Sequence, residues 1–559
     1  MFRNLKHLNK IINYSVLSDI LMMLFAGVTV VTYNYDKNLS PEYLLFFMQM
    51  VVLWFALKTA YRFLPVVKEF ILIALLFWIS VESVRGLGQL YGYFPSRHSL
   101  FKTTGSFFSP GPYGGFIALI FPLVLQYYLI YKHKNKLAQY PVLFAGAVAL
   151  LVFPATMSRT AWIAALAGCL LVLFSQKSLI VKLHLCLKRN KRRTVLYVLL
   201  ICTVVLVSGV GIYNMKKDSA NGRLFMWKIT ALAIKESSLT GVGSGGFAAA
   251  YGKAQSAYFK SGKGNETEKL VAGSPEYAFN EYLQIFLEKG LQGIVLFLLL
   301  SFLIIRSGIR NGHTGAAGSF LTLSVFAFAS YPYQLWQFPL IWILLGSVCT
   351  ATPNGRNKSA ALFGRKKRTV FFLMLTALCT VSVSLVPRQK KYHQARKEWQ
   401  SLQPLYNMKA YERVNNDYAK LYSLLNHDPK FVFEYGMILN GIEQNEKAEQ
   451  IFARGIEISC DPMFCNVRGR NYHEMRRYEE AEACYVHSTY LLPERIYPYY
   501  LLTKLYGDSA NYQPKKMRQA AQAVLEKEPK IHSQAIDEMR SEVRKLLTEK
   551  EEGEIDEKN

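Results

Sequence analysis

The sequence predicts an all-α protein in which a polytopic helical membrane bundle of about eleven spans is followed by a soluble domain of helical repeats. Hydrophobic residues make up 51% of the 559 residues and charged residues only 19%, which is little charge for a soluble chain. Long apolar runs follow one another up to about residue 390, separated by short basic stretches. Beyond that point the apolar residues take up helical spacing and a pattern recurs along the chain.

The apolar runs are long enough to cross a membrane as helices. A hydrocarbon core of about 30 Å needs roughly 20 apolar residues in a helix. On this basis we expect residues 1–390 to form the membrane domain. The expected spans lie at about residues 13–33, 43–61, 66–84, 112–131, 139–156, 161–176, 194–213, 286–306, 317–331, 335–350 and 369–386.

The distribution of lysine and arginine orients this bundle. Basic residues concentrate in alternate connections, as in the runs at 132–136, 182–193 and 355–368. Because such runs favour the cytoplasmic side, we expect the N-terminus inside and the C-terminus outside. The large loop at 214–285 then faces the non-cytoplasmic side. Membrane topology therefore accounts for the net charge of +27, and no nucleic-acid partner is expected.

The tail after residue 391 contains an internal repeat. The peptide KAEQIFARGIEISCDP, which begins at Lys447, is echoed 33 residues later by EAEACYVHSTYLLP, and an Asp-Pro pair recurs at 428 and 461. Paired helices with a period near 34, a small residue and a closing proline are the tetratricopeptide signature. We therefore expect a tetratricopeptide-like helical domain at 391–545, with an ordinary helical bundle as the alternative. Residues 546–559 are charged and are expected to be a disordered tail.

The cysteines do not suggest a metal site. The eight cysteines form neither a CxxC pair nor a zinc-type spacing, which gives no reason to expect a metal, and we expect no cofactor either. A disulfide between Cys460 and Cys465 is conceivable in an oxidising compartment, but we interpret these residues as structural. The first apolar run is long and lacks a small-residue cleavage site, so no cleavable signal peptide is expected.

Four basic residues in the outside loops are candidates for binding an anion. Arg159 lies in the turn between two expected spans, where an arginine is costly unless it is paired or functional. Arg223 precedes a tryptophan and the glycine-rich stretch GVGSGGF. Arg97 and Lys102 lie in the loop 85–111 and are weaker candidates. Guanidinium groups suit phosphate oxygens, so these residues point to an anionic lipid head group. Snorkelling of Arg159 to the interface is the alternative.

Four stretches of the chain resemble the O-antigen ligase and O-antigen polymerase superfamily, which includes bacterial protein O-oligosaccharyltransferases. GSFFSPGPYGGFIALIFPL resembles the family's turn entering a span, and MSRTAW resembles its Ser-Arg turn. NGRLFMWKITALAIKESSLTGVGSGGF resembles its Arg-x-x-x-Trp motif with a following glycine-rich segment. In FNEYLQIFLEKGLQG, Asn280 is followed after nine residues by Gly290 and Gly293, as in the family's histidine-asparagine motif. The resemblance covers about residues 70–350.

The resemblance implies a glycosyltransferase that uses a lipid-linked donor. Such enzymes transfer a glycan from undecaprenyl diphosphate to an acceptor hydroxyl at the outer face of the bacterial cytoplasmic membrane. The large loop and the repeat domain would then be periplasmic. On this basis Arg159 and Arg223 are expected to bind the diphosphate, with Arg97 and Lys102 as further candidates. The acceptor would be lipid A core or a protein, and the repeats would suit a protein partner.

One departure from the family motif bears on catalysis. Phe279 stands where the family has histidine, and phenylalanine cannot accept a proton. The acids nearest to it are Glu276 and Glu281, and either carboxylate is a candidate base. We favour Glu276 slightly, and the alternative is that both are ordinary loop and cap residues. A homologue that has lost catalysis would carry the same substitution.

Three other functions compete with the ligase interpretation. A polymerase of polysaccharide repeat units would have the same motifs. A transporter would need polar residues deep in several spans, and Asp19 is the clearest intramembrane acid. A membrane-tethered scaffold would work through the tail alone, although about eleven spans are many for an anchor.

Overall fold

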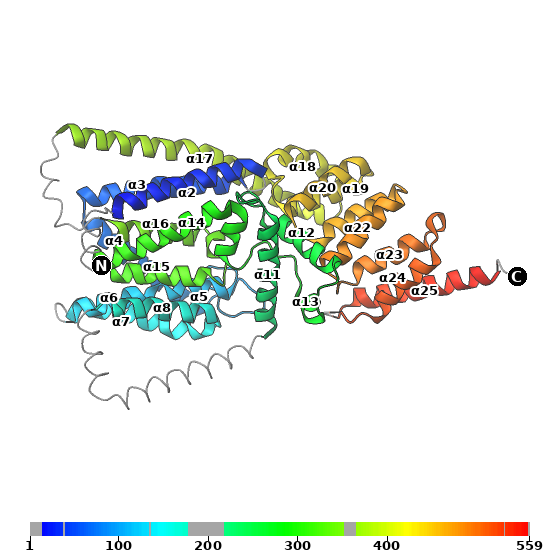
Figure 1. Cartoon of the computed structure of the whole chain (residues 1–559), viewed down its shortest axis with the longest axis horizontal. Helices are drawn as coiled ribbons and strands as arrows, with labels where there is room; N and C mark the ends of the chain where they lie inside the picture. The colour runs from blue at the N-terminus through cyan, green and yellow to red at the C-terminus, as the bar shows by residue number, and fades with distance from the viewer. Residues whose placement is uncertain are drawn as a thin grey trace, which may run out of the picture. The chain divides into compact units, whose positions relative to one another are not determined.

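The computed structural model describes residues 14–36, 40–132, 136–176, 217–351, 365–529 and 532–556 (Figure 1). These residues form helices joined by loops, and the described part of the chain has no β-strand, which confirms the all-α prediction. The chain divides into two compact units. Unit 1 contains residues 1–31, 44–217 and 278–386, and unit 2 contains residues 32–43, 218–277 and 387–559.

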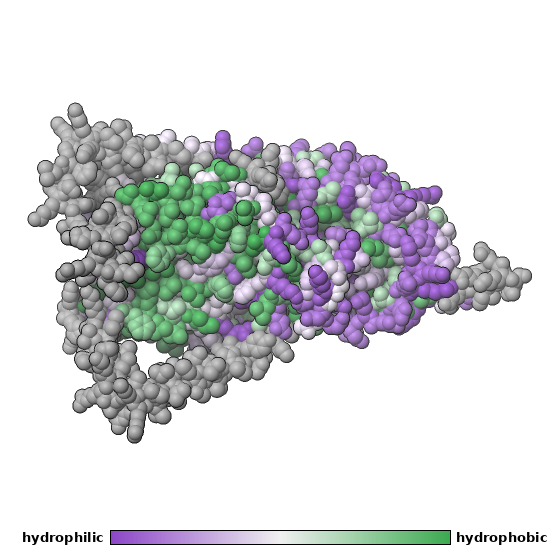
Figure 2. All heavy atoms as spheres, in the orientation of Figure 1, coloured by the Kyte–Doolittle hydropathy of each residue, from purple (hydrophilic) through white to green (hydrophobic). Residues whose placement is uncertain are grey.

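Unit 1 is a bundle of apolar helices. Figure 2 shows hydrophobic residues gathered over the surface of these helices. Two of its elements, α2 and α3, extend by a few residues into unit 2, and α17 (Arg365–Asn407) is divided between the two units at residue 387. The helices are α2 (Tyr14–Asp36), α3 (Pro41–Phe63), α4 (Val66–Leu90), α5 (Pro110–Ala118), α6 (Ile120–Tyr131), α7 (Lys136–Val152), α8 (Arg159–Phe174), α14 (Glu281–Arg310), α15 (Thr314–Ala327) and α16 (Gln337–Thr350).

Six stretches of the described chain are long and apolar enough to cross a membrane. They correspond to α2, α3, α4, the continuous α5–α6 segment, α7 and α14, and α8, α15 and α16 are shorter apolar helices. The expected span at 194–213 lies outside the described residues, and that at 369–386 falls within α17 (Arg365–Asn407). Six helices thus fit the expectation of several membrane spans, while the number eleven stays a prediction.

The short helix α15 lies in the interior of unit 1. It packs against α6, α8, α14 and α16. Glycine allows the closest of these approaches, because a Cβ atom at Gly168 of α8 would lie 2.5 Å from the carbonyl oxygen of Gly318 in α15. Small residues permit such backbone contact between membrane helices. The sequence therefore brings α8 and α15 together through a pair of glycines.

Unit 2 is built mainly from amphipathic helices with a polar outer surface, seen in purple in Figure 2. Its first part is α11 (Lys217–Glu236), α12 (Phe247–Lys260) and α13 (Glu266–Val271). The end of α17 follows. The remaining helices are α18 (Tyr411–Leu425), α19 (Pro429–Gly441), α20 (Asn445–Ile458), α21 (Pro462–Glu474), α22 (Tyr478–Leu491), α23 (Tyr497–Gly507), α24 (Pro514–Glu526) and α25 (Gln534–Asp556).

The tail contains two helical hairpins with the same design. Helices α19 and α21 begin 33 residues apart, and Asp428 and Asp461 cap them by accepting backbone N–H bonds. Gly436 packs against the ring of Phe452, and 33 residues later Gly469 packs against Tyr485. The internal repeat is therefore structural. Its assignment to the tetratricopeptide class stays a prediction.

The described part of the large loop folds onto the tail within unit 2. Gln255 of α12 donates a hydrogen bond to the carbonyl oxygen of Leu491 at 2.7 Å, and Ser256 contacts His487 Nδ1 at 3.2 Å. A Cβ atom at Gly252 would lie 2.7 Å from that of Cys460. The structure thus groups loop and tail, whereas the predicted domains follow chain order, with the large loop inside 1–390 and the repeats at 391–545. Cys460 and Cys465 are free thiols, so the conceivable disulfide is not formed.

Candidate functional site

Two of the sequence motifs meet in unit 1 at the N-terminal ends of α5 and α8. A Cβ atom at Gly114 of α5 would lie 2.8 Å from Ser158 Cβ and 2.8 Å from Thr156 Oγ1. The second motif turns sharply here, because Met157 adopts a left-handed conformation with φ of 50°. Ser158 then occupies the N-cap position of α8. The glycine of the first motif is therefore needed for the turn of the second to pack closely.

The C-terminal part of α15 joins this region to the third motif of unit 1. The ring of Phe326 packs against Gly115 in α5, and two residues earlier the Ser324 carbonyl accepts a hydrogen bond from Tyr282 Oη at 2.8 Å. Tyr282 lies in the first turn of α14. The N-termini of α5, α8 and α14 therefore gather around one end of α15. Helix N-termini carry partial positive charge and favour anions.

Arg159 is the first residue of α8 and is partly buried at this place. The preceding turn is held by hydrogen bonds to the Phe153 carbonyl, from Thr156 Oγ1 at 2.7 Å and from Trp162 Nε1 at 3.4 Å. Because this turn is held by hydrogen bonds, the backbone of Arg159 has a defined position. The predicted anion-binding residue thus lies where helix N-termini already favour negative charge.

The start of α14 is shaped by Phe279 and Asn280. Asn280 Oδ1 caps the helix by accepting the N–H groups of Tyr282 and Leu283. Phe279 has a φ of 49°, and its ring contacts Tyr331 at 4.8 Å between centroids. The residue in the family's histidine position therefore packs against an aromatic ring in this chain.

The two candidate acids have different surroundings. Glu281 is 2% exposed, and its Oε1 accepts the backbone N–H of Tyr333 at 2.8 Å, which ties α14 to the turn before α16. Glu276 is exposed in the loop before α14 and belongs to unit 2. Neither unit therefore contains both acids, and the structure gives Glu281 a clear packing role.

A buried polar row follows Glu281 along α14 and was missed in the sequence. Gln284 accepts the N–H of Ala278 and donates to Glu288 Oε1 at 3.2 Å. Glu288 and Lys289 are 9% and 6% exposed. The row ends at Gly290, whose φ of 68° breaks the helix. The spacing of these polar residues, three and four apart on one helical face, is the signal that could have revealed them.

Arg97 and Lys102 both lie in the exposed loop between α4 and α5. Arg97 Nη1 donates to the Ser106 carbonyl at 2.7 Å and so braces the loop. This contact occupies part of its guanidinium, and Lys102 projects from the exposed part of the same loop. The structure thus places both in unit 1, as it does Arg159, while Arg223 belongs to unit 2.

In unit 2, Arg223 lies partly buried on α11 and the glycine-rich stretch follows that helix. Gly241, Gly243 and Gly245 all have φ between 83° and 92°, a region that favours glycine. Between them, Ser244 donates its N–H to the Thr32 carbonyl at 3.2 Å. These glycines therefore build a tight turn that is anchored to the end of α2.

A hydrogen-bonded triad that the sequence did not suggest lies on α11, α12 and α13. Lys228 Nζ contacts Tyr258 Oη at 2.7 Å and Glu268 Oε1 at 2.6 Å. The Tyr258 hydroxyl also donates to Glu268 Oε2 at 2.8 Å. Hydrogen bonding to Glu268 raises the pKa of Lys228, so the pair remains charged at neutral pH. The triad links α12 and α13 to α11, the helix that carries Arg223.

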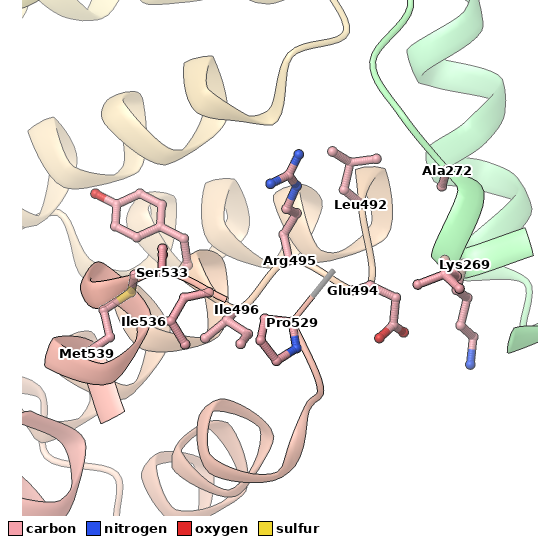
Figure 3. Close-up of a pocket in the computed structure, with 12 residues that line it drawn as sticks. Lys269, Ala272, Leu492, Glu494, Arg495, Ile496, Pro529, Ser533, Ile536 and Met539 are labelled. Carbon is pink, nitrogen blue, oxygen red and sulfur yellow. The ribbon is translucent and has the colours of Figure 1, made fainter. Parts of the chain in front are cut away.

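A pocket of about 350 Å³ lies elsewhere in unit 2 (Figure 3). It is bounded by the end of α13, the connection from α22 to α23, and the connection from α24 to α25. Apolar side chains such as Leu492 and Ile496 form much of its wall, and Lys269, Glu494 and Arg495 supply charge. It contains none of the site residues predicted from the sequence.

A match to a known protein family covers four of the candidate site residues. Residues 144–298 match the family described as O-antigen ligase. The match includes Arg159, Arg223, Glu276 and Glu281, whereas Arg97 and Lys102 precede it. No curated protein matches the chain. The match supports the resemblance to the O-antigen ligase superfamily. Together with the apolar helices, it fits a multi-pass membrane protein with a glycosyltransferase-like function.

Proposed function

We propose that this protein transfers a glycan from a polyprenyl diphosphate-linked donor to an acceptor hydroxyl at the outer face of the bacterial cytoplasmic membrane. The observation that carries the proposal is that Arg159 begins α8 where the turn before this helix packs on α5, near the end of α15 that Tyr282 of α14 also contacts. The family match over 144–298 agrees with it. The donor is an undecaprenyl diphosphate-linked glycan, and the acceptor is a lipid A core or a protein.

In the proposed reaction the acceptor oxygen attacks the anomeric carbon of the donor. The bond from that carbon to the diphosphate oxygen breaks, and its electron pair leaves with the polyprenyl diphosphate. Arg159 and the nearby helix N-termini stabilise the charge that develops on this leaving group. Arg223, which belongs to unit 2, is a second candidate for binding the diphosphate, and Arg97 and Lys102 are further candidates.

The acceptor proton needs a base, and Glu276 is the better candidate. Glu281 is buried and accepts the Tyr333 N–H, so its removal would disturb packing. Glu276 is exposed in a loop of the matched segment and is free to meet a hydroxyl from solvent. Partial burial by bound substrate would increase the basicity of this carboxylate.

The composition of unit 2 supports the proposed topology. Residues 32–43, 218–277 and 387–559 fold as one compact unit, and segments that fold together lie on the same side of a membrane. We place all three segments on the periplasmic side. This agrees with the basic runs that favour a cytoplasmic location for the alternate connections.

The proposal is tested by complementing a deletion strain with wild type, Arg159→Ala, Arg159→Lys, Arg223→Ala or Glu276→Gln. We expect each alanine variant to lower transfer by about 10²- to 10³-fold, as when one stabilising group of a transition state is lost. Arg388→Ala, in an exposed part of α17, is the matched control. Unchanged surface glycans and glycoproteins in the deletion strain would refute the proposed enzymatic function and favour a scaffold function.

Repeat-unit polymerisation and glycan ligation are distinguished by the products that accumulate when each is lost. A polymerase defect shortens glycan chains to single repeat units, whereas a ligase defect leaves long chains on the carrier. The paired hairpins α19–α20 and α21–α22 favour a protein as acceptor or partner. Transport has less support, because Asp19 forms an ion pair with Lys58 at 2.6 Å and so has a structural role.

A further inference from the structure

The loop that joins α4 to α5, residues 91–109, exposes an unusual amount of apolar surface. Tyr93 is 80% exposed, Leu100 82% and Phe108 73%. Contiguous exposed apolar residues on a folded segment mark a contact surface. The exposed apolar residues of this α4–α5 loop are Tyr91, Tyr93, Phe94, Leu100, Phe101 and Phe108.

These side chains are exposed although the loop backbone is well held. Gln89 Oε1 accepts the N–H groups of Thr104 and Gly105 at 2.9 and 2.7 Å. Glu82 Oε2 accepts the N–H of Ser106 at 2.9 Å. Both acceptors are buried side chains of α4. Polar contacts with α4 therefore hold the loop backbone in place, while its apolar side chains are exposed.

The exposed face of α4 continues into this loop. Phe70, Phe77 and Val84 are 69%, 70% and 53% exposed and follow one another at a spacing of seven residues. The next position at this spacing is Tyr91, which is 74% exposed. With a rise of about 1.5 Å per residue, Phe70 and Tyr91 lie roughly 30 Å apart. This is about the thickness of the hydrocarbon core of a bilayer.

We infer that the α4–α5 loop lies in the membrane–water interface and binds the surface of a bilayer that contains anionic lipids. The lipid-facing stripe of α4 leads into the loop, so Tyr91 and Tyr93 reach head-group level, where aromatic side chains are favoured. Arg97 and Lys102 are both exposed among them, and their charge complements lipid phosphates. The inference does not depend on which reaction the protein catalyses.

Photolabelling of the full-length protein in nanodiscs tests this inference. The probe is a phospholipid that carries a diazirine near its head group, and labelled positions are mapped by peptide mass spectrometry. We expect peptides from 91–109 to be labelled at least as strongly as those from 66–84. The region around Met408, which is 78% exposed on unit 2, serves as the reference and should be labelled several-fold less.

The charge contribution is tested in neutral nanodiscs and in nanodiscs with about one third phosphatidylglycerol. Anionic lipid should increase labelling of the loop in the wild type, and R97A/K102A should remove that increase while labelling of 66–84 is retained. Retained labelling of 66–84 also shows that the variant is folded. Loop labelling as low as that around Met408 would overturn the inference and leave a glycan or a protein as the partner of the aromatic surface.

Discussion

Both units of the molecule bury apolar side chains, but they expose opposite kinds of side chain. In unit 1, Phe77 is 70% exposed while Lys58 is 6% exposed and paired with Asp19. In unit 2, Tyr418 and Phe431 are fully buried and stacked. The ion pair between Lys420 and Asp417 lies at the surface there, and the Lys420 side chain is 72% exposed. The surrounding solvent, lipid in one case and water in the other, explains the contrast.

The contrast predicts its largest effect at the buried ion pair of unit 1. Asp19→Leu removes the carboxylate that compensates the buried Lys58 charge, and we expect a loss of about 3–5 kcal/mol of stability. The double variant D19L/K58M should recover most of it. Thermal unfolding in detergent measures both. The corresponding change in unit 2, Lys420→Ala, should cost less than about 1 kcal/mol because the pair is exposed.

Unit 2 should be sensitive to acid through His427. Burial lowers the pKa of this imidazole to about 4, and Arg396 and Arg454 add to the effect. The folded pKa lies below the ordinary value of about 6.5, so the unfolded state binds a proton first as the pH falls. The stability that depends on neutral His427 is fully present above about pH 6.5 and is lost as the pH falls toward 4. The loss is at most roughly 3 kcal/mol.

Hydrogen exchange of amides in α18 and α19, measured between pH 7 and 4.5 and corrected for intrinsic rates, follows this loss. In His427→Gln the loss should be smaller than in the wild type. An equal slope in both proteins would assign the acid sensitivity to other groups.

A third prediction concerns the contact between the large loop and the repeats. Gly252→Leu places a side chain where Cys460 already lies within 2.7 Å of a Cβ position. Overpacking of this kind costs about 1–3 kcal/mol, and we expect α12 to lose protection from hydrogen exchange. Gly273→Leu is the control, because a Cβ atom at Gly273 would have no neighbour within 4 Å. Equal protection of α12 in the two variants would contradict the proposed importance of this contact.

The smallest expected effect is at the caps of the repeats. Asp461 accepts the N–H of Met463 at 2.9 Å, and Asp461→Ala should cost about 1 kcal/mol. Asp428→Ala, at the equivalent position of the preceding hairpin, should have a similar effect. Proteolysis rates in the folded state compare the two. A large difference between them would show that the hairpins are not equivalent.

Local signals account for what the sequence predicted well. Hydropathy located the helices of unit 1, and the recurring Asp-Pro pairs located the starts of α19 and α21. The motif turns were also recognisable, because Met157 and Gly114 lie within short sequence patterns. Such features depend on neighbouring residues alone, so a single sequence is enough to reveal them.

Contacts between distant residues could not be predicted in the same way. The hydrogen bond from Gln255 to Leu491 joins positions 236 residues apart, and no periodicity records it. The burial of Glu281 was equally hidden, because its acceptor role depends on the turn at Tyr333. The candidate site was therefore predicted as a set of residues, while their division between two units came from the structure.

The composition of unit 2 also sets an order of events during synthesis. Its segments at 32–43 and 218–277 leave the ribosome long before the repeats at 387–559 that complete it. Helix α12 is therefore synthesised before Leu491 and Cys460, the residues against which it packs. Only a chain translated nearly to its end can assemble this unit. A chain that is truncated before the repeats therefore cannot complete the fold of unit 2.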